Sequence, residues 1–435
     1  MKKKLVSILL CVSMTACLFA GCGSKQEGAE KGTEEKKEET AGTGTLEVWL
    51  PAKLNGEDEA VWDEISAPFE KEHGVDVTFQ FTSWKDYESK YSSAISTKSG
   101  PDVGYMYVEM FPTYIDAGAV EDLGEYLTDE DYENYTVLGD QYKIFGKNYG
   151  IAQGGPEAVL AMFYNKEILA SIEESAPETW EDVMRIAKKA KDAGKCGIAQ
   201  GWGQTFYQDL NWNWYSFLYQ AGGDIFDEEG KCILDEKEGV ETAQFLYDLK
   251  NTENVLPEDT MSLTNSEAFE KYFLSGEAAI GFVSAGSSMF EQLKENNIDY
   301  GFTYELKGNN GSMGARASVD QLVLMSAAED KELAFEFIKY VTGKEGGEKY
   351  HELTKSNPNM KDQKWYGVEE AEEPYTKAVG EGTIRPITAA RRAPEVYDYL
   401  WKELQEMMNG SVTPEDAMKD VAEYANAMDY SAPAE

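Results

Sequence analysis

The chain has 435 residues, with 80 acidic against 40 basic side chains and a formal net charge of −40 at pH 7. A field of that sign repels phosphate backbones and anionic lipid headgroups, which excludes nucleic-acid binding and binding to a membrane surface as hypotheses. A hydrophobic content of 42% and an aromatic content of 12% are enough for ordinary cores, and the length predicts two domains.

The N-terminus has the features of an export signal. Basic residues 2–4 precede an apolar run over residues 5–20, which is shorter than the roughly 20 residues of a membrane-spanning helix. The run ends at Ala-Gly before Cys22, which resembles the lipobox of bacterial lipoproteins, although Phe19 stands where a branched aliphatic residue is usual. The resemblance implies a signal peptide over residues 1–21 and a lipidated Cys22. The alternative is an ordinary signal peptide that is cut near Ala20.

Residues 22–45 are predicted to form a disordered tether. They consist almost entirely of small, polar and charged residues, and such a segment buries too little apolar surface to offset the entropy lost on ordering. As a flexible coil it spans about 25 Å. The protein is therefore expected on the outer face of the cytoplasmic membrane, held there only by its lipid.

Strand-like and helix-like patterns alternate along the rest of the chain, which predicts the α/β class. The predicted elements are a strand at 46–50, a helix at 61–69, a strand at 75–81, a helix at 84–97, a strand after the turn at 101–102, a helix from Thr179 to 190, a hairpin joining 225–226 to 232–234, a strand at 278–283, and helices at 333–341 and 396–407. The acidic hairpin loop lacks the spacing of an EF-hand, so it is interpreted as a turn and not as a calcium site.

The chain has few cysteine and histidine side chains that could form disulfides or bind a metal. Only Cys196 and Cys232 remain after the signal and the lipidation site, and both are expected to be buried free thiols rather than a disulfide. His73 and His351 have no metal-ligand spacing. No metal site and no cofactor are predicted.

An ordered set of short landmarks runs through the body of the chain. In order, they are Ser99–Val103, Gly118–Leu123, Tyr149–Ala152, Tyr164–Lys166, Pro177–Trp180, Gly222–Gly223, Phe273–Ile280 and Thr413–Ala417. This set resembles the extracellular solute-binding proteins of sugar importers, the group that contains maltose-binding protein. The resemblance covers residues 46–428.

The resemblance implies a two-lobed clamp in which each lobe is a sheet flanked by helices. Lobe 1 would comprise residues 46–153 and 299–345, and lobe 2 residues 154–298 and 346–435. The hinge crossings would lie near Gln153–Pro156, Asp299–Tyr300 and Gly343–Gly346. Such a protein is a monomer without catalytic activity that closes on a carbohydrate and delivers it to the permease subunits of an ABC importer.

The richest candidate for sugar recognition is the segment from Trp202 to Tyr219, because aromatic faces cover the apolar face of a pyranose while polar groups bond its hydroxyls. Its candidates are Trp202, Gln204, Trp212 and Trp214. The alternative for Trp214 is the core face of a helix.

Other candidate contacts follow from the resemblance. They are Lys53 and Asn55 after the first strand, Tyr105, Tyr107 and Glu109 at a cleft-facing strand end, Glu157 after the first crossing, Ser287, where many relatives carry an aromatic residue, and Asp320. A shift of one residue in the third strand would exchange its inward and outward side chains.

Arginine is rare in the chain, and most of it falls between Arg316 and Arg392. A guanidinium is suited to carboxylates. The hypothesis is that Arg316 or Arg391 contacts the ligand, for example a uronic acid. The alternative is ion pairing with the abundant Asp and Glu side chains.

Two other functions stay open on the sequence alone. A binding protein for a non-sugar solute such as a polyamine would also suit an acidic, aromatic cleft. A lipid-anchored glycosidase would need two carboxylates at a controlled separation, and 80 acidic residues never exclude such a pair.

Overall fold

The structure is a computed structural model that describes residues 44–428 apart from 55, 159 and 228. The predicted signal peptide, Cys22 and all but the last residues of the predicted tether lie outside the described residues. Within the described part of the chain, no helix is both long enough and apolar enough to cross a membrane.

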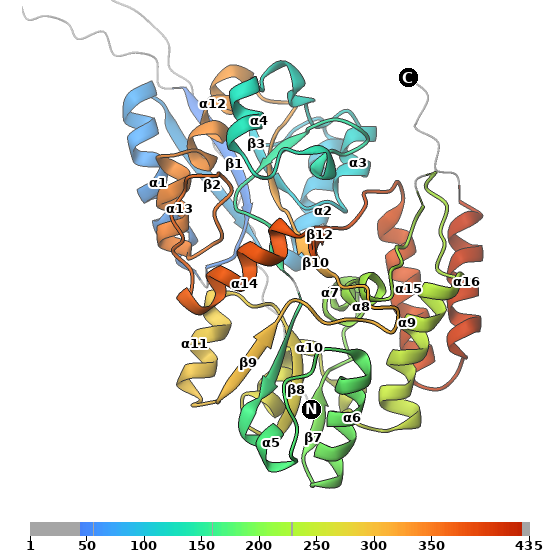
Figure 1. Ribbon diagram of the computed structural model, residues 1–435. Helices are drawn as coiled ribbons and strands as arrows, with labels where there is room; N and C mark the ends of the chain where they lie inside the picture. Colours follow the sequence, from blue (N-terminus) through green and yellow to red (C-terminus); the bar gives the residue numbers. More distant parts are fainter. Residues whose placement is uncertain (1–43, 55, 159, 228, 429–435) are drawn as a thin grey trace, which may run out of the picture. The chain divides into compact units, whose positions relative to one another are not determined.

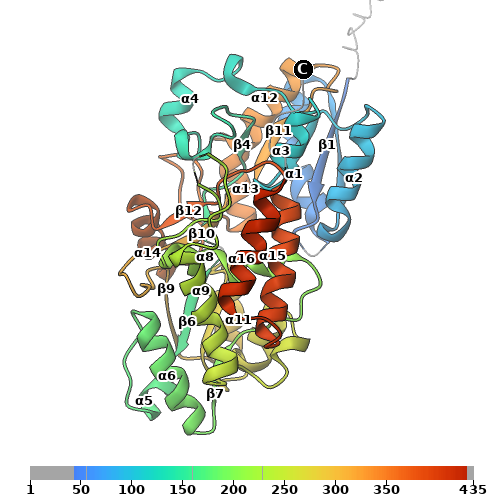
Figure 2. The same ribbon diagram turned by 90° about the vertical axis from the view of Figure 1, so that its right-hand side faces the viewer.

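The first of the three sheets among the described residues has five strands in the order β2-β1-β3-β11-β4. Figure 1 labels β1, β2 and β3, and Figure 2 labels β4 and β11. These strands are β1 (Thr45–Pro51), β2 (Asp76–Thr82), β3 (Val103–Met106), β4 (Gly150–Ala152) and β11 (Gln321–Leu324). β1 is parallel to β2 and β3, while β11 is antiparallel to β3 and β4. The apolar residues of β1 alternate along the strand, and three of them, Leu46, Val48 and Leu50, are buried.

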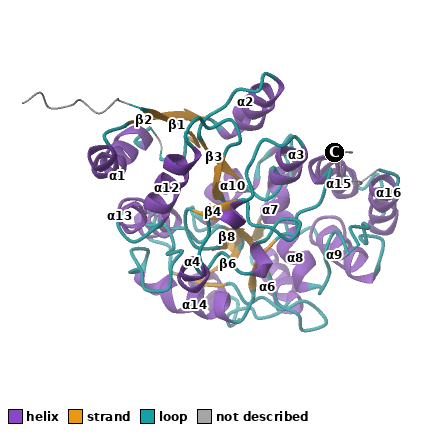
Figure 3. Cartoon of the chain, turned by 90° about the horizontal axis from the view of Figure 1, so that it is seen from above, coloured by secondary structure: helices purple, strands orange, loops and turns teal. Residues whose placement is uncertain are grey.

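Helices cover both faces of this sheet. α1 (Asp58–His73) and α2 (Trp84–Ser96) lie on opposite sides of β1 and β2 (Figure 3). On the α1 side, the ring of Trp62 packs 5.4 Å from that of Phe79, and on the α2 side Tyr91 packs 5.4 Å from Trp49. α12 (Lys331–Thr342) and α13 (Gly346–Thr354) pack on α1.

The second sheet has four strands in the order β7-β8-β6-β9. They are β6 (Ala161–Asn165), β7 (Cys196–Ala199), β8 (Ala278–Val283) and β9 (Tyr300–Thr303). Every residue of β8 is buried, as expected for a central strand covered on both faces. Phe163 of β6 lies in a cluster of phenylalanine rings that includes Phe269 and Phe290.

A third sheet of three short strands has the order β12-β10-β5. β5 (Glu157–Ala158) follows β4 of the first sheet and precedes β6 of the second, and β10 (Ala315–Ser318) lies between β9 and β11 in the same way. β12 (Ile384–Pro386) is parallel to β10. The small sheet is thus built from the chain segments that connect the two larger sheets.

The remaining helices complete the fold. They are α3 (Phe111–Asp116), α4 (Asp129–Asn134), α5 (Lys166–Ser171), α6 (Trp180–Asp192), α7 (Leu210–Asn213), α8 (Tyr215–Gln220), α9 (Lys237–Tyr247), α10 (Asn265–Ala268), α11 (Ser287–Glu295), α14 (Glu369–Gly380), α15 (Ala393–Met408) and α16 (Pro414–Asn426). There are also single turns at 123–125, 140–142, 207–209 and 260–262, and π-helical turns at 248–252 and 269–273. α15 and α16 lie side by side (Figure 2), and α9 packs on both.

The structure confirms the predicted elements. Thr179 forms a capping box with Asp182 at the start of α6, and the predicted hairpin is present as an antiparallel bridge between Phe226 and Cys232. Cys196 and Cys232 are free thiols, of which Cys232 is buried and Cys196 partly buried.

The crossings between the sheets differ from the expected positions at two places. Residues 300–303 form β9 and pair in the four-stranded sheet, so the return to the five-stranded sheet comes later, between Thr303 and Gln321. α13 follows the expected crossing near 343–346, yet it stays with the first sheet, where Tyr350 packs 5.6 Å from Trp62. An apolar strand pattern is local and does not say which sheet the strand joins.

The buried carboxyl group of Asp209 is expected to make the stability of this fold depend on pH. The side chain is 1% exposed and accepts a hydrogen bond from the backbone N–H of Asn265 at 3.0 Å. Burial raises the pKa of Asp209 to about 6, and Glu267 adds to the increase. Its contribution to stability is therefore fully present below about pH 4 and is lost as the pH rises through about 6.

We expect Asp209→Asn to remove this pH dependence. Between about pH 4 and pH 8, the free energy of unfolding of the native protein should fall by about 3 kcal/mol relative to the variant, since one pKa unit corresponds to about 1.4 kcal/mol. Urea titrations across this range measure the difference. The matched control is Asp362→Asn at an exposed position. A constant difference between Asp209→Asn and the native protein would contradict the assignment.

Candidate ligand-binding site

A cavity of about 540 Å³ lies where the loops after several strands meet. Its walls come from the loop after β1, Tyr105 of β3, residues 153–157 around β5, residues 285–291 at the start of α11, and the turn after β10. Segments 350–357 and 365–375 close it from the other side. The carboxyl ends of strands in open α/β sheets are the usual place for ligands.

A cluster of interacting polar side chains in the cavity is centred on Asp320. The carboxylate accepts a hydrogen bond from the hydroxyl of Tyr105 at 2.5 Å and one from Ser318 at 2.6 Å. The ammonium of Lys53 lies 3.7 Å from the same carboxylate and 4.3 Å from the centre of the Tyr105 ring. Burial and the nearby Asp320 carboxylate raise the pKa of Tyr105, so this phenol stays a hydrogen-bond donor.

The position of Lys53 is set by its backbone. The N–H groups of Lys53 and Leu54 both donate to the carboxylate of Asp58, the first residue of α1, at 2.8 and 3.0 Å. A carboxylate at this point also interacts favourably with the N-terminal end of the helix dipole. The loop after β1 is therefore held against the helix that follows it.

Glu157 is the second carboxylate of the cavity. It begins β5 and lies opposite Ser318 of β10 in the antiparallel pair. Its side chain lines the cavity and is exposed to solvent there. Partial loss of hydration against the cavity wall raises the pKa of Glu157, Lys53 lowers it, and Asp320 raises it further. The carboxylate forms no hydrogen bond or ion pair with any described residue.

Aromatic side chains form much of the remaining wall. Tyr304, Tyr350, Trp365 and Tyr375 all line the cavity. Trp365 is oriented by a hydrogen bond from its indole N–H to the carbonyl of Val368 at 3.1 Å, and its ring lies 5.4 Å from that of Tyr375. None of the four was predicted as a site residue. The Trp-Tyr-Gly run at residues 365–367, in an otherwise polar stretch, was the available signal.

Two features of the first crossing also face the cavity. The side-chain amide N–H₂ of Gln153 is buried and has no hydrogen-bond partner among the described residues, so it is a donor available to a water or a ligand. Gly155 permits a close approach of two chain segments, because a Cβ there would lie 2.3 Å from the carbonyl oxygen of Pro358.

Among the predicted contacts, Lys53, Tyr105, Glu157, Ser287 and Asp320 line this cavity. Ser287 donates from its hydroxyl to the carbonyl of Lys355 at 3.3 Å. Asn55 lies outside the described residues.

The aromatic candidates on the 202–219 segment lie elsewhere. Trp202 and Trp214 are fully buried in the core, and Trp202 stacks on Trp401 with ring centres 5.5 Å apart. Trp212 is partly buried, and its indole N–H points to Ser284 at 3.5 Å. The Gln204 carbonyl accepts from the indole of Trp401. Trp214 is thus buried, as its core-face alternative expects, and its contact with a ligand stays a prediction.

Three of the predicted charged contacts, Glu109, Arg316 and Arg391, are engaged in ion pairs. A guanidinium nitrogen of Arg316 lies 3.0 Å from a carboxylate oxygen of Glu109, and both side chains are 4% exposed. Arg391 pairs with Asp116 at 2.9 Å. Neither arginine is among the residues that line the cavity, and both form ion pairs of the kind given as the alternative. Contact of either arginine with a ligand stays a prediction. Tyr107 also lies outside the cavity and donates to Glu88.

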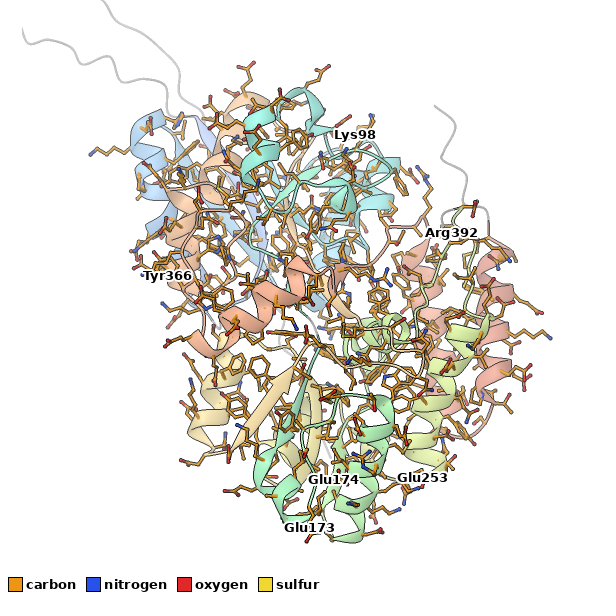
Figure 4. The ribbon with its side chains drawn as sticks, viewed as in Figure 1. Lys98, Glu173, Glu174, Glu253, Tyr366 and Arg392 are labelled. Carbon is orange, nitrogen blue, oxygen red and sulfur yellow. The ribbon has the colours of Figure 1, made fainter. Side chains whose placement is uncertain are left out.

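A second hollow, of about 520 Å³, lies beside α6. Its basic residues are already paired: Arg185 and Lys189 both contact Glu174, at 3.0 and 2.6 Å, and Lys188 contacts Glu253 at 2.9 Å. The two acidic partners, Glu174 and Glu253, are labelled in the lower part of Figure 4. These pairs leave little charge for an anion. Among the described residues, no group of His, Cys, Asp or Glu side chains is arranged to hold a metal ion.

Comparison with known proteins places this geometry in a family. A family model described as bacterial extracellular solute-binding protein matches residues 52–348. The diacetylchitobiose-binding protein of Streptomyces coelicolor is 25% identical over 97% of both chains. The fold matches the Listeria monocytogenes substrate-binding protein in complex with cycloalternan, with a TM-score of 0.72, 20% identity and coverage of 88% of this chain and 98% of that one.

A second solved structure agrees with this fold. The maltose-bound MalE3 of T. maritima matches with a TM-score of 0.70 and 21% identity, over 88% of this chain and 99% of that chain. The family match covers well over half of the sequence, and both structural matches extend over nearly the whole of the described body. The chain belongs to the bacterial extracellular solute-binding proteins.

Proposed function

We propose that the protein captures a carbohydrate, an oligosaccharide in particular, in the cavity around Asp320 and delivers it to an ABC importer. The observation that carries the proposal is the composition of the cavity wall. Aromatic rings of Tyr350 and Trp365 face the same space as the hydrogen-bonding groups of Lys53 and Asp320. This is the pairing that sugar recognition requires, because a pyranose has apolar C–H faces and a polar rim.

The names of the similar proteins support the proposal. The relative from Streptomyces coelicolor is a diacetylchitobiose-binding protein, and the two structures carry cycloalternan and maltose. All three ligands are carbohydrates, although they differ in linkage and length. The three names thus agree on carbohydrate as the ligand class.

Capture would proceed by closure of two lobes, one around each large sheet. We assign lobe 1 to the five-stranded sheet with α12 and α13, and lobe 2 to the four-stranded sheet with the C-terminal helices. The crossings then fall at 153–156, between Thr303 and Gln321, and between α13 and α14. A ligand that contacts both lobes stabilises the closed population through its differential affinity for that state.

A panel of ligands tests the proposed function directly. We expect neutral oligosaccharides to raise the melting temperature of the purified protein, because a ligand that binds only the folded state stabilises it. The oligosaccharides should be recovered unchanged after incubation. Shortened products would instead indicate a glycosidase. A response to spermidine alone would indicate a polyamine-binding protein.

Tyr105→Phe tests the position of the site. The change removes the hydroxyl that bonds Asp320 and Lys53 but keeps the ring. We expect carbohydrate affinity to fall about tenfold, the usual effect of losing a hydrogen bond to a charged group. Calorimetric titration measures it. The control is Tyr114→Phe, a buried tyrosine that does not line the cavity. Equal losses in both variants would argue against the cavity.

The anchor is a separate proposal. We propose that Cys22 carries the lipid and that residues 23–45 tether the binding body at the outer face of the membrane. The tether would keep the carrier at high effective concentration near its importer.

Cys22→Ala should therefore release the protein from the membrane while leaving its sugar affinity unchanged. Fractionation of cells that express either the native protein or the variant measures the release. Titration of each purified protein with sugar measures the affinity. Retention of the variant on the membrane would contradict lipidation at Cys22.

A further inference from the structure

A large aromatic side chain next to the cavity is exposed to solvent. Trp84, the first residue of α2, is 41% exposed. The centre of its ring lies 5.7 Å from the ammonium of Lys53 and 6.2 Å from the ring centre of Tyr105, and both of these residues, unlike Trp84, line the cavity. Single exposed aromatic residues are common on protein surfaces. Trp84 is distinguished by its neighbours, because its indole extends the aromatic wall of the cavity outwards.

The indole of Trp84 is supported by other aromatic rings. Besides Tyr105, the rings of Tyr87 and Tyr107 lie 5.8 and 6.1 Å from it, centre to centre. Tyr87 and Tyr105 are fully buried, so the indole packs on the core of the fold. A ring that is fixed before a ligand arrives loses little conformational entropy on binding. Trp84 thus presents a preorganised apolar surface to solvent.

A hydrogen-bonding group lies next to this surface. Glu88 follows Trp84 by one turn of α2, so the two side chains share a face of the helix. The hydroxyls of Tyr107 and Tyr207 both donate to Oε1 of Glu88, the second of them at 3.1 Å. Oε2 of this partly buried carboxylate has no hydrogen-bond partner among the described residues. It can accept a hydrogen bond from a hydroxyl of a ligand whose ring lies on Trp84.

Lys53 connects this surface to the inner part of the cavity. Its ammonium lies 3.7 Å from the Asp320 carboxylate and 4.3 Å from the centre of the Tyr105 ring, and Trp84 is its next aromatic neighbour. A sugar unit that bonds Lys53 and Asp320 therefore has the indole within reach of the unit that follows it. A pyranose has apolar C–H faces and a polar rim, which matches an indole beside a carboxylate.

We propose that Trp84 forms an outer subsite of the carbohydrate site, where its indole stacks on the sugar unit that follows the one bonded to Lys53 and Asp320. Glu88 would accept a hydrogen bond from a hydroxyl of the stacked unit. The preferred ligand is then an oligosaccharide long enough to occupy both positions, and a shorter sugar binds in the cavity alone. This inference rests on the proposed carbohydrate function and adds a length requirement to it.

The test measures affinity against the length of the sugar by calorimetric titration. Three series are used, each from one to five units: maltooligosaccharides, cellooligosaccharides and N-acetylchitooligosaccharides. In a series that binds, we expect the affinity of the native protein to rise at least about tenfold at one added unit, in line with burial of an exposed aromatic face. In Trp84→Ala this step should shrink to less than about threefold, while the affinity for the sugar one unit shorter should change less than about threefold.

Two further variants make the test specific. Trp84→Phe keeps an aromatic face and should retain part of the step. Tyr424→Ala removes another exposed aromatic ring, which stacks on Tyr399 and does not line the cavity, and it should leave the step unchanged. All variants are first compared with the native protein by thermal melting. Trp84→Phe keeps the proposal testable if Trp84→Ala does not fold, because full retention of the step in Trp84→Phe would then contradict the proposal.

The outcomes separate the inference from the function on which it rests. A step that persists in Trp84→Ala, or a native affinity that does not depend on length, would overturn the outer subsite and leave carbohydrate capture standing. An equal loss at every length in Trp84→Ala would also overturn the subsite, since it would show that Trp84 only positions Lys53 or Tyr105. Failure of every series to bind would overturn the carbohydrate function and the subsite together, and a response to spermidine would then indicate a polyamine-binding protein.

Discussion

The candidate site depends on the carboxylate of Asp320, because this residue ties together four segments that are far apart in the sequence. It lies between β10 and β11, where the chain enters the five-stranded sheet. Its side chain bonds Tyr105 of β3 and pairs with Lys53 after β1, while its carbonyl accepts the N–H of Gln153 at the other crossing, at 3.2 Å. The polar groups of the cavity are thus fixed to the crossings themselves. A hinge motion there would leave this cluster intact, so the site is preorganised before a ligand enters.

The buried pair of Glu109 and Arg316 has a different character. It joins the loop after β3 to β10, and one carboxylate oxygen and the guanidinium Nε lack partners among the described residues. Burial raises the pKa of Glu109 in spite of Arg316, which is the sign of a costly desolvation. Such a pair adds little net stability, yet removing one member leaves an uncompensated charge. Its structural effect is to favour one arrangement of the two segments, since only that arrangement satisfies either charge.

Local patterns predicted the elements well, whereas only some of the predicted contacts line the cavity. Apolar alternation predicted β1, and the Thr179 cap predicted the start of α6, because these features depend on neighbouring residues alone. Trp202 and Trp214 were candidates through aromatic density, but an aromatic residue that packs a core has the same local pattern as one that faces a ligand. Trp365 was missed for the opposite reason. It faces the cavity only because the chain after α13 turns back across the strand ends, and no periodicity within residues 355–368 encodes that path.

The acidic side chains of the chain have different effects on the outer surface and in the cavity. On the outer surface, most of the charge is solvated and screened, and it bears on solubility more than on recognition. Inside the cavity screening is weaker, so it matters whether each carboxylate has a cation as its partner. Asp320 pairs with Lys53, whereas the other three cavity carboxylates, of Glu57, Glu157 and Glu291, have no ion pair among the described residues. The aromatic rings supply affinity for any sugar of suitable size, so they do not discriminate among sugars. Discrimination arises where one ligand satisfies a buried polar group that its competitors leave unpaired, and the side-chain amide of Gln153, which is buried and has no hydrogen-bond partner among the described residues, is such a group in this cavity.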